Sequence, residues 1–154
     1  MPEEDPPIRL LLIEDDEADL RLLEETLKEI PANFRLEYAS TGAEALRRLD
    51  ISGPSEQLPE VVLLDLNLPG LDGRKVLAHL REVPQLAALP VVVITASPAD
   101  VDVLTAFDLR AQGYLRKPVE APSLHSVLSR VSSRVPPPPG EPPRSPPPKS
   151  RAVS

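Results

Sequence analysis

Between Ile8 and Val135 the chain alternates short continuous apolar runs with apolar residues at helical spacing. A continuous run is typical of a strand buried on both faces, whereas apolar residues three or four positions apart indicate the inner face of a helix. The runs predict five strands, of which the second alternates polar and apolar side chains like a half-buried strand. The predicted strands span residues 8–13, 34–38, 61–64, 90–94 and 113–116.

A helical segment follows each predicted strand. Residues 41–44 form a capping box for the second helix, which we expect to continue through Leu49. Ser97 and Pro98 suit the N-cap and the first position of the fourth helix, which we expect to end near Leu109. The apolar stripes of the other helices are Leu20, Leu23, Leu27 and Ile30, then Val76, Leu77 and Leu80, and last Leu124, Val127, Leu128, Val131 and Val135.

This alternation of strand and helix predicts an α/β fold with a doubly wound, five-stranded parallel sheet covered on both faces. We expect the flavodoxin-like strand order 2-1-3-4-5 of a (βα)5 domain. In such a sheet ligands bind at the carboxyl ends of the first and third strands, where the strand order reverses. Asp15 and Asp65 lie at these two ends, so we expect them to face each other across the crevice.

Length and charge narrow the class of protein. The 154 residues fit one globular domain. A formal charge of −7 would repel a nucleic-acid backbone, so we expect no nucleic-acid partner. Cysteine is absent, which excludes a disulfide framework and is compatible with a reducing cytoplasm. No apolar run approaches the roughly 18 residues of a membrane span, and the start is not a secretory signal, so we expect a cytoplasmic protein with no membrane partner.

Proline marks the domain boundaries. We expect a flexible N-terminus at residues 1–7, a globular domain at residues 8–135 and a Pro-rich C-terminal tail at residues 136–154. The tail carries nine of the 21 prolines, which favour extended polyproline II structure without internal hydrogen bonds. It is either a disordered end or an arm that docks on a partner or on a second copy of the chain.

Three consecutive acids, Glu14, Asp15 and Asp16, follow the first strand, where a flavodoxin would need small hydroxyl or glycine residues to cradle a phosphate. Carboxylates about 4 Å apart repel by roughly 4 kcal/mol per pair at an effective dielectric constant near 20, so the cluster needs a cation. Oxygen ligands without cysteine or a suitably placed histidine indicate Mg²⁺. The simpler alternative is a solvated loop in which Asp16 or Glu17 caps the first helix.

Asp65 adds phosphoryl chemistry to this edge of the sheet. A carboxylate can attack a phosphoryl group to form an aspartyl phosphate, while a metal and the ammonium of Lys117 offset the charge on the phosphoryl oxygens. Thr95, at the end of the fourth strand, can donate a hydroxyl hydrogen bond to the same group. Taken alone, Thr95 would be an ordinary β-branched strand residue.

Together these residues resemble the response-regulator receiver domains of two-component signalling, over residues 8–135. Asp65 is followed 30 residues later by Thr95 and 52 residues later by Lys117, which is the spacing of that family. The resemblance implies that Asp65 is the phosphoacceptor and that Thr95 and Lys117 contact the phosphoryl group. It also implies that Mg²⁺ is held by Asp15, by Asp65, by Glu14 through water and by the backbone carbonyl of Asn67.

The resemblance carries further roles. It implies that Thr95 and Tyr114 form the conformational switch, and that the bond between Lys117 and Pro118 is cis. Asn67 and Ser97 would govern the rate at which water removes the phosphoryl group. Because Ser97 offers no carboxylate or amide to orient that water, we expect slow autodephosphorylation.

The expected function is that of a single-domain response regulator in a phosphorelay, which receives its phosphoryl group from a partner histidine kinase. The acids after the first strand and residues 64–73 look most like single-domain receivers associated with phytochrome-type kinases. We expect output through protein contacts, with a homodimer formed by the fourth helix, the fifth strand and the fifth helix, or by the C-terminal tail. No enzyme activity is expected beyond self-catalysed phosphotransfer and slow autodephosphorylation.

Two alternatives belong to other classes. A haloacid-dehalogenase-type phosphohydrolase would also form an aspartyl phosphate, but its signature needs a carboxylate two residues after the nucleophile, where this chain has Asn67. A receiver fold that never takes phosphate would be a binding module only. His79 and His125 lie on predicted helices without partners at ligand spacing, so we interpret both as surface or packing residues and not as phosphodonors.

Overall fold

The structure of the chain is a computed structural model that describes residues 6–49, 58–66, 73–97, 99–106 and 109–140. Its strands form one parallel sheet in the order β2-β1-β3-β4-β5, which confirms the predicted fold class. The strands are β1 (Ile8–Ile13), β2 (Phe34–Ala39), β3 (Val61–Asp65), β4 (Val91–Thr95) and β5 (Gly113–Arg116).

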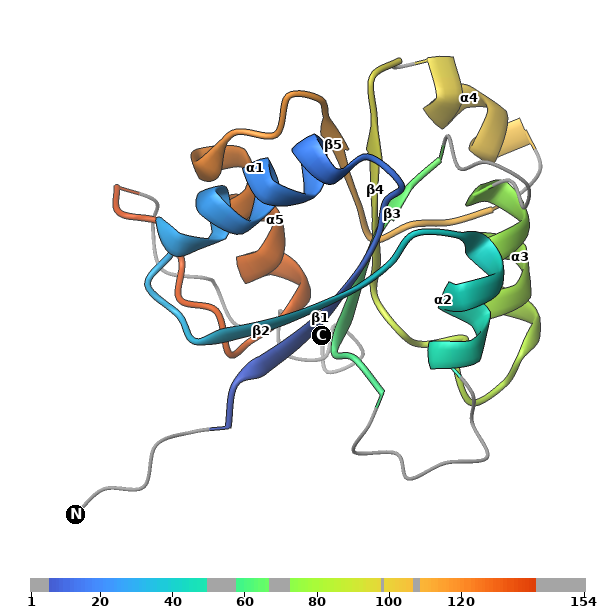
Figure 1. Cartoon of the computed structure of the whole chain (residues 1–154), viewed down its shortest axis with the longest axis horizontal. Helices are drawn as coiled ribbons and strands as arrows, with labels where there is room; N and C mark the ends of the chain where they lie inside the picture. The colour runs from blue at the N-terminus through green and yellow to red at the C-terminus, as the bar shows by residue number, and fades with distance from the viewer. Residues whose placement is uncertain (1–5, 50–57, 67–72, 98, 107–108, 141–154) are drawn as a thin grey trace, which may run out of the picture.

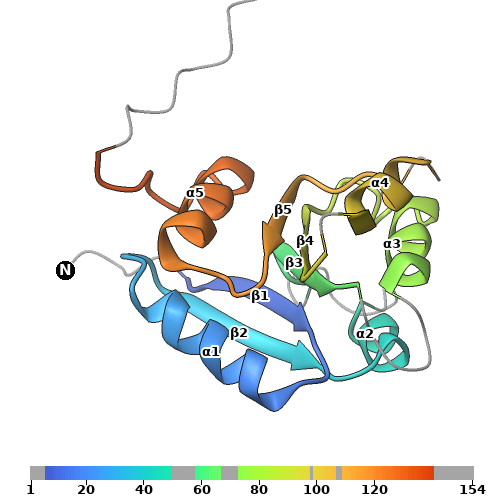
Figure 2. The same ribbon diagram turned by 90° about the horizontal axis from the view of Figure 1, so that it is seen from above.

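In the described segments, five helices cover the sheet in two layers. Figures 1 and 2 show α1 and α5 against one face and α2, α3 and α4 against the other. Each layer encloses its own core of buried aliphatic side chains, because the three inner strands present apolar residues to both faces. The helices are α1 (Glu17–Lys28), α2 (Gly42–Arg48), α3 (Gly73–Glu82), α4 (Ala99–Ala106) and α5 (Ala121–Val131).

Capping residues set where the first two helices begin. The Asp16 side chain accepts hydrogen bonds from the N–H groups of Ala18 and Asp19, so this third acid is the N-cap of α1. Thr41 caps α2 by accepting from the N–H of Glu44 at 3.1 Å, and Glu44 reaches back to Ser40. The predicted capping box is therefore present, with its return bond one residue earlier than the usual position.

The last helix is shorter than predicted. We expected its apolar stripe to include Val135, but α5 ends at Val131 and the chain turns back. Val135 lies in an irregular segment and is buried in the core beside α5. Because Pro136 follows it, a helical backbone is disfavoured at Val135. The buried side chain of His125 lies 2.7 Å from the Pro136 carbonyl oxygen and ties this segment to α5.

The two predicted ends of α4 fall at or beside residues that the structure does not describe. The described helix α4 begins at Ala99, and Pro98, the expected first helical position after Ser97, lies outside the described residues. The helix α4 is assigned as far as Ala106, and because residues 107–108 lie outside the description, its expected end near Leu109 stays a prediction. Within the described segments, none of the helices combines the length and apolarity that crossing a membrane requires.

Candidate functional site

The carboxyl ends of β1 and β3 lie next to each other in the sheet. Ile13 pairs with Leu64 in the parallel register, so the next residues, Glu14 and Asp65, emerge side by side at one edge. The backbone N–H of Glu14 donates to the Ala39 carbonyl of β2 and extends the ladder by one bond of 3.0 Å. The predicted meeting of the acidic loop and Asp65 at the switch point is confirmed.

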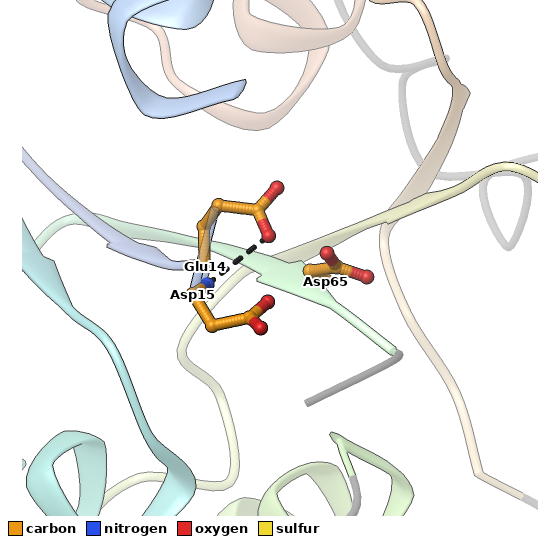
Figure 3. A group of neighbouring side chains, drawn as sticks. All are labelled: Glu14, Asp15 and Asp65. Carbon is orange, nitrogen blue, oxygen red and sulfur yellow. Dashed lines mark hydrogen bonds between the residues drawn. The ribbon is translucent and has the colours of Figure 1, made fainter. Parts of the chain in front are cut away.

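Three carboxylates converge at this edge. Oxygen atoms of Glu14, Asp15 and Asp65 all lie within 4.8 Å of one another. Figure 3 shows the three side chains pointing into a common space from the ends of β1 and β3, with the Asp15 N–H donating to Glu14 at 3.1 Å. Glu14 and Asp65 are buried, whereas Asp15 is exposed. Buried carboxylates this close need a cation or a shared proton.

Lys117 supplies the positive charge. Its Nζ lies 2.7 Å from Asp65 Oδ2, 2.9 Å from Glu14 Oε1 and 2.9 Å from Asp19 Oδ2. The lysine backbone is anchored by an N–H bond of 2.9 Å to the Thr95 carbonyl, directly after β5. The bond from Lys117 to Pro118 is cis, as the resemblance implied.

The pKa values reflect this crowding. Burial first, and then the hydrogen bond with Asp65, raise the pKa of Glu14 to about 8 against the opposing effect of Lys117. Burial alone would lower the pKa of Lys117, but its hydrogen bonds to Asp65, Glu14 and Asp19 outweigh burial and raise it. In the metal-free protein near neutral pH, the site therefore tends to keep one proton on Glu14 and a fully charged lysine.

Thr95 ends β4 beside this cluster. It is buried, and its hydroxyl accepts from the Ser97 N–H at 3.1 Å and lies 3.3 Å from the Ser97 carbonyl. Tyr114 on β5 is 38% exposed, so its ring is turned at least partly to the surface. Asn67, to which the sequence assigns a metal-binding carbonyl, lies outside the described residues.

The donor set fits a hard divalent cation. The three carboxylates offer only oxygen atoms as ligands. Glu14 and Asp65 are buried at the ends of β1 and β3, so their positions are already defined in the metal-free protein. When bound, such an ion would neutralise the cluster and polarise a phosphoryl oxygen. Glu14, Asp15 and Asp65 would hold it.

One member of the cluster was not predicted from the sequence. Asp19 stands on the first turn of α1 and reaches Lys117. The sequence did contain a signal for this contact, because side chains on a helix lean toward its N-terminus and α1 begins directly after the acidic loop. Asp19 in the first turn of α1 is therefore directed toward the site, although an acid at this position also suits the helix dipole.

Comparisons with known proteins agree with this geometry. The family model of the response regulator receiver domain matches residues 10–129. Response regulator Rcp1 from Synechocystis sp. is 38% identical over 133 residues, which are 85% of this chain and 90% of Rcp1.

Solved structures give the same picture. The bacteriophytochrome response regulator RtBRR superposes with a TM-score of 0.74 at 33% identity, covering 82% of this chain and 79% of that one. The Mn²⁺-bound form of Rcp1 superposes with a TM-score of 0.64 at 37% identity, covering 82% and 91% of the two chains. The phosphorylated cyanobacterial phytochrome response regulator RcpA gives 0.64 at 32% identity, covering 83% and 91%.

Proposed function

The chain belongs to the response regulator receiver family and is a receiver of two-component signalling, and from this premise we propose that Asp65 is its phosphoacceptor. The observation that carries the proposal is the position of Asp65: it is buried at a strand end, 2.7 Å from the Lys117 ammonium and within 4.8 Å of two further carboxylates. Among the carboxylates of the cluster, Asp65 lies nearest to Lys117.

Phosphoryl transfer would proceed by attack of an Asp65 carboxylate oxygen on phosphorus. The new O–P bond forms as the N–P bond to a phosphohistidine donor breaks, and the imidazole nitrogen keeps the electron pair and takes a proton. Lys117 stabilises charge on the phosphoryl oxygens, and Thr95 donates its hydroxyl to one of them. The protein acts as phosphoacceptor and self-catalyst and not as an enzyme with turnover.

Receiver domains bind a divalent metal at this acidic pocket, and we propose that the ion here is Mg²⁺. Asp15 and Asp65 would bind it directly, Glu14 through water and Asn67 by its backbone carbonyl. Hard carboxylate oxygens support this choice, because Mg²⁺ typically takes one or two carboxylates and keeps several waters. The related Rcp1 has been solved in a Mn²⁺-bound form.

Signal output would follow from a switch between Thr95 and Tyr114. The Thr95 hydroxyl, which now interacts with Ser97, would turn to the phosphoryl group, and the partly exposed Tyr114 would move inward. The surface of α4, β5 and α5 would change with it. We propose that this surface, or the C-terminal tail, forms a homodimer and that nucleic acid is not a partner, in keeping with the charge of −7.

Receiver domains partner with histidine kinases, and the bacteriophytochrome and phytochrome regulators among the similar structures support a phytochrome-type kinase as the donor. We propose that this protein and its histidine kinase meet in the cytoplasm. The receiver unit is proposed to span residues 8–135, with its last residue buried in the core, and the Pro-rich tail to begin at residue 136. The comparisons favour a two-component receiver over the phosphohydrolase and over a phosphate-independent binding module.

Autodephosphorylation is proposed to be slow. Ser97 is exposed beside Thr95 and offers no carboxylate or amide to orient an attacking water, and Asn67 is the second tuning position. Ser97→Glu should shorten the life of the phosphoryl group severalfold, while Ser97→Ala should change it little. Phosphate release after removal of the donor measures this, and a wild type that loses its phosphoryl group as fast as Ser97→Glu would contradict it.

The proposed phosphoacceptor is tested by intact mass after incubation with acetyl phosphate and Mg²⁺. We expect one added phosphoryl group on the wild type, none on Asp65→Asn and none in EDTA. Asp15→Asn is the matched control, since it removes the same charge but leaves the proposed nucleophile in place, so adduct formation should be slowed and recover at high Mg²⁺. An adduct of equal yield on Asp65→Asn would refute the assignment, and rapid multiple turnover would favour a phosphohydrolase.

A further inference from the structure

Among the residues that the structure describes, Lys117 has three carboxylate partners, and they are not equivalent. An ammonium carries three N–H donors, and Asp65, Glu14 and Asp19 each lie within 2.9 Å of Nζ, so every donor has an acceptor. Glu14 and Asp65 also belong to the carboxylate triad that fits a metal. Asp19 does not belong to that triad. Of these three partners, it is the one that a metal in the triad leaves unengaged.

A cation in the triad changes the balance around Lys117. It attracts the carboxylates of Glu14 and Asp65 that now accept from the lysine, and it repels the ammonium because both are positive. Lys117 nevertheless has to stay beside Asp65 if it is to meet the phosphoryl oxygens. A further attraction from outside the triad would keep it there, and the Asp19 carboxylate has the charge and the contact to supply it.

The backbone holds Asp19 in place for this task. It occupies the first turn of α1, where its N–H donates to the Asp16 cap, and its side chain leans back toward the strand ends. Asp19 and Lys117 line one small cavity together with Leu22 and Val119, so the ion pair stands beside apolar side chains. Both ends of the pair are thus anchored to separate elements.

The Asp19 side chain is 39% exposed, and an ion pair in that setting contributes little to folding stability. Its loss should therefore affect the ammonium more than the fold. We propose that Asp19 is a positioning residue that retains the Lys117 ammonium beside Asp65 when a divalent ion occupies the triad. The proposal rests on the proposed function, in which Asp65 accepts the phosphoryl group.

The test compares Asp19→Asn with Glu17→Gln. Glu17 is an exposed acid on the same turn of α1, so its substitution removes the same charge without touching Lys117. The chain has four lysines, Lys28, Lys75, Lys117 and Lys149, so the ammonium signals of lysine-labelled protein can be resolved by NMR and assigned through Lys117→Arg. Spectra are recorded without metal and at saturating Mg²⁺, and adduct formation from acetyl phosphate is followed by intact mass.

We expect the wild type and Glu17→Gln to keep a slowly exchanging Lys117 ammonium signal in Mg²⁺. Asp19→Asn should show that signal only without metal, and its phosphorylation should slow about tenfold while its melting temperature stays within a few degrees of the wild type. Retention of the signal in metal-saturated Asp19→Asn would overturn the proposal whatever the rate. Loss of the signal with a rate equal to that of Glu17→Gln would overturn it as well.

The two proposals can fail separately. If the wild type gains no phosphoryl group, the assignment of Asp65 fails, while the ammonium signal still decides whether Asp19 holds Lys117 against the metal. If the wild type is phosphorylated and Asp19→Asn behaves like Glu17→Gln in both measurements, the function stands and the role of Asp19 falls.

Discussion

Gly73 is the point at which α3 touches the strand end that carries Asp65. A Cβ atom added at Gly73 would lie 2.7 Å from the Asp65 carbonyl oxygen, 2.7 Å from the Leu66 Cα and 2.9 Å from the Leu66 carbonyl oxygen. All three atoms belong to the backbone, so no side chain can rotate to make room. Gly73→Ala must separate the start of α3 from the end of β3.

The cost follows from these contacts. Carbon atoms pack at roughly 3.5–4.0 Å, so the shortest carbon contact is too close by about 1 Å. Overpacking of this kind costs about 1–3 kcal/mol, with the backbone clash placing it at the upper end, and the better helix propensity of alanine offsets less than about 1 kcal/mol. A net loss of about 2 kcal/mol lowers the melting temperature of a chain this size by about 4–8 °C.

The same displacement reaches the site. Movement of Asp65 by a fraction of an ångström alters its place relative to Lys117 and the carboxylate triad, and misplacement on this scale slows a positioned reaction by about tenfold to a hundredfold. Thermal and urea unfolding followed by circular dichroism measure the stability. Calorimetric titration with Mg²⁺ and adduct formation from acetyl phosphate measure the site.

Gly113→Ala is the matched control. Its added Cβ would meet the Val127 Cγ1 atom at 2.8 Å, at the amino end of β5, whereas the site lies at the carboxyl ends of the strands. It should therefore also lower stability but leave Mg²⁺ affinity and phosphorylation near the wild-type values. The reasoning is refuted if Gly73→Ala melts at or above the wild-type temperature, or if it affects the site no more than Gly113→Ala does.

Three further outcomes follow from the structure. The pKa of Glu14 is raised from 4.5 to about 8, so between these pH values the folded protein keeps a proton that the unfolded chain releases. The free energy of unfolding of the metal-free protein should therefore fall as pH rises from about 5 to 8. Unfolding in EDTA should show this slope, Glu14→Gln should flatten it, and a flat wild-type curve would contradict it. Leu128→Ala, on the buried face of α5, should cost about 2–5 kcal/mol in urea unfolding, whereas Leu22→Ala on the exposed side of α1 should cost under about 1 kcal/mol. Thr41→Ala should lose about 1 kcal/mol with the α2 cap and Thr41→Ser should keep most of it, a difference that equal midpoints would disprove.

Most of the fold was predictable because its signals are local. The inner strands are continuous aliphatic runs, and such runs separated by helical stripes leave few topologies to consider. The end of the last helix was not predictable in the same way. Val135 keeps the spacing of the α5 stripe, yet it reaches the core from a turn after Ser132, and its burial depends on packing that spacing alone does not reveal.

The site divides along a similar line. Asp65, Glu14 and Lys117 stand at strand ends, so the order of the strands is enough to bring them together. Asp19 reaches the same ammonium from a helix. An acid in the first turn of a helix is usually explained by its interaction with the helix dipole, so the sequence alone did not indicate this role. The close approach at Gly73 depends on the distance between two backbones, which no residue pattern encodes beyond the presence of a glycine.

The charges of the site link metal binding to phosphorylation. The carboxylates of Glu14, Asp19 and Asp65 surround Lys117, and Asp15 lies beside them, so within the described part of the chain one lysine faces four acids. The raised pKa of Glu14, which follows mainly from its burial, reflects this excess of negative charge. A phosphoryl group on Asp65 would add negative charge without adding a fixed cation. The phosphorylated site would therefore bind a divalent ion more tightly than the free one, and by linkage the ion would favour the phosphorylated state by the same factor. Lys117 cannot replace that ion, because its three donors are already shared among three carboxylates.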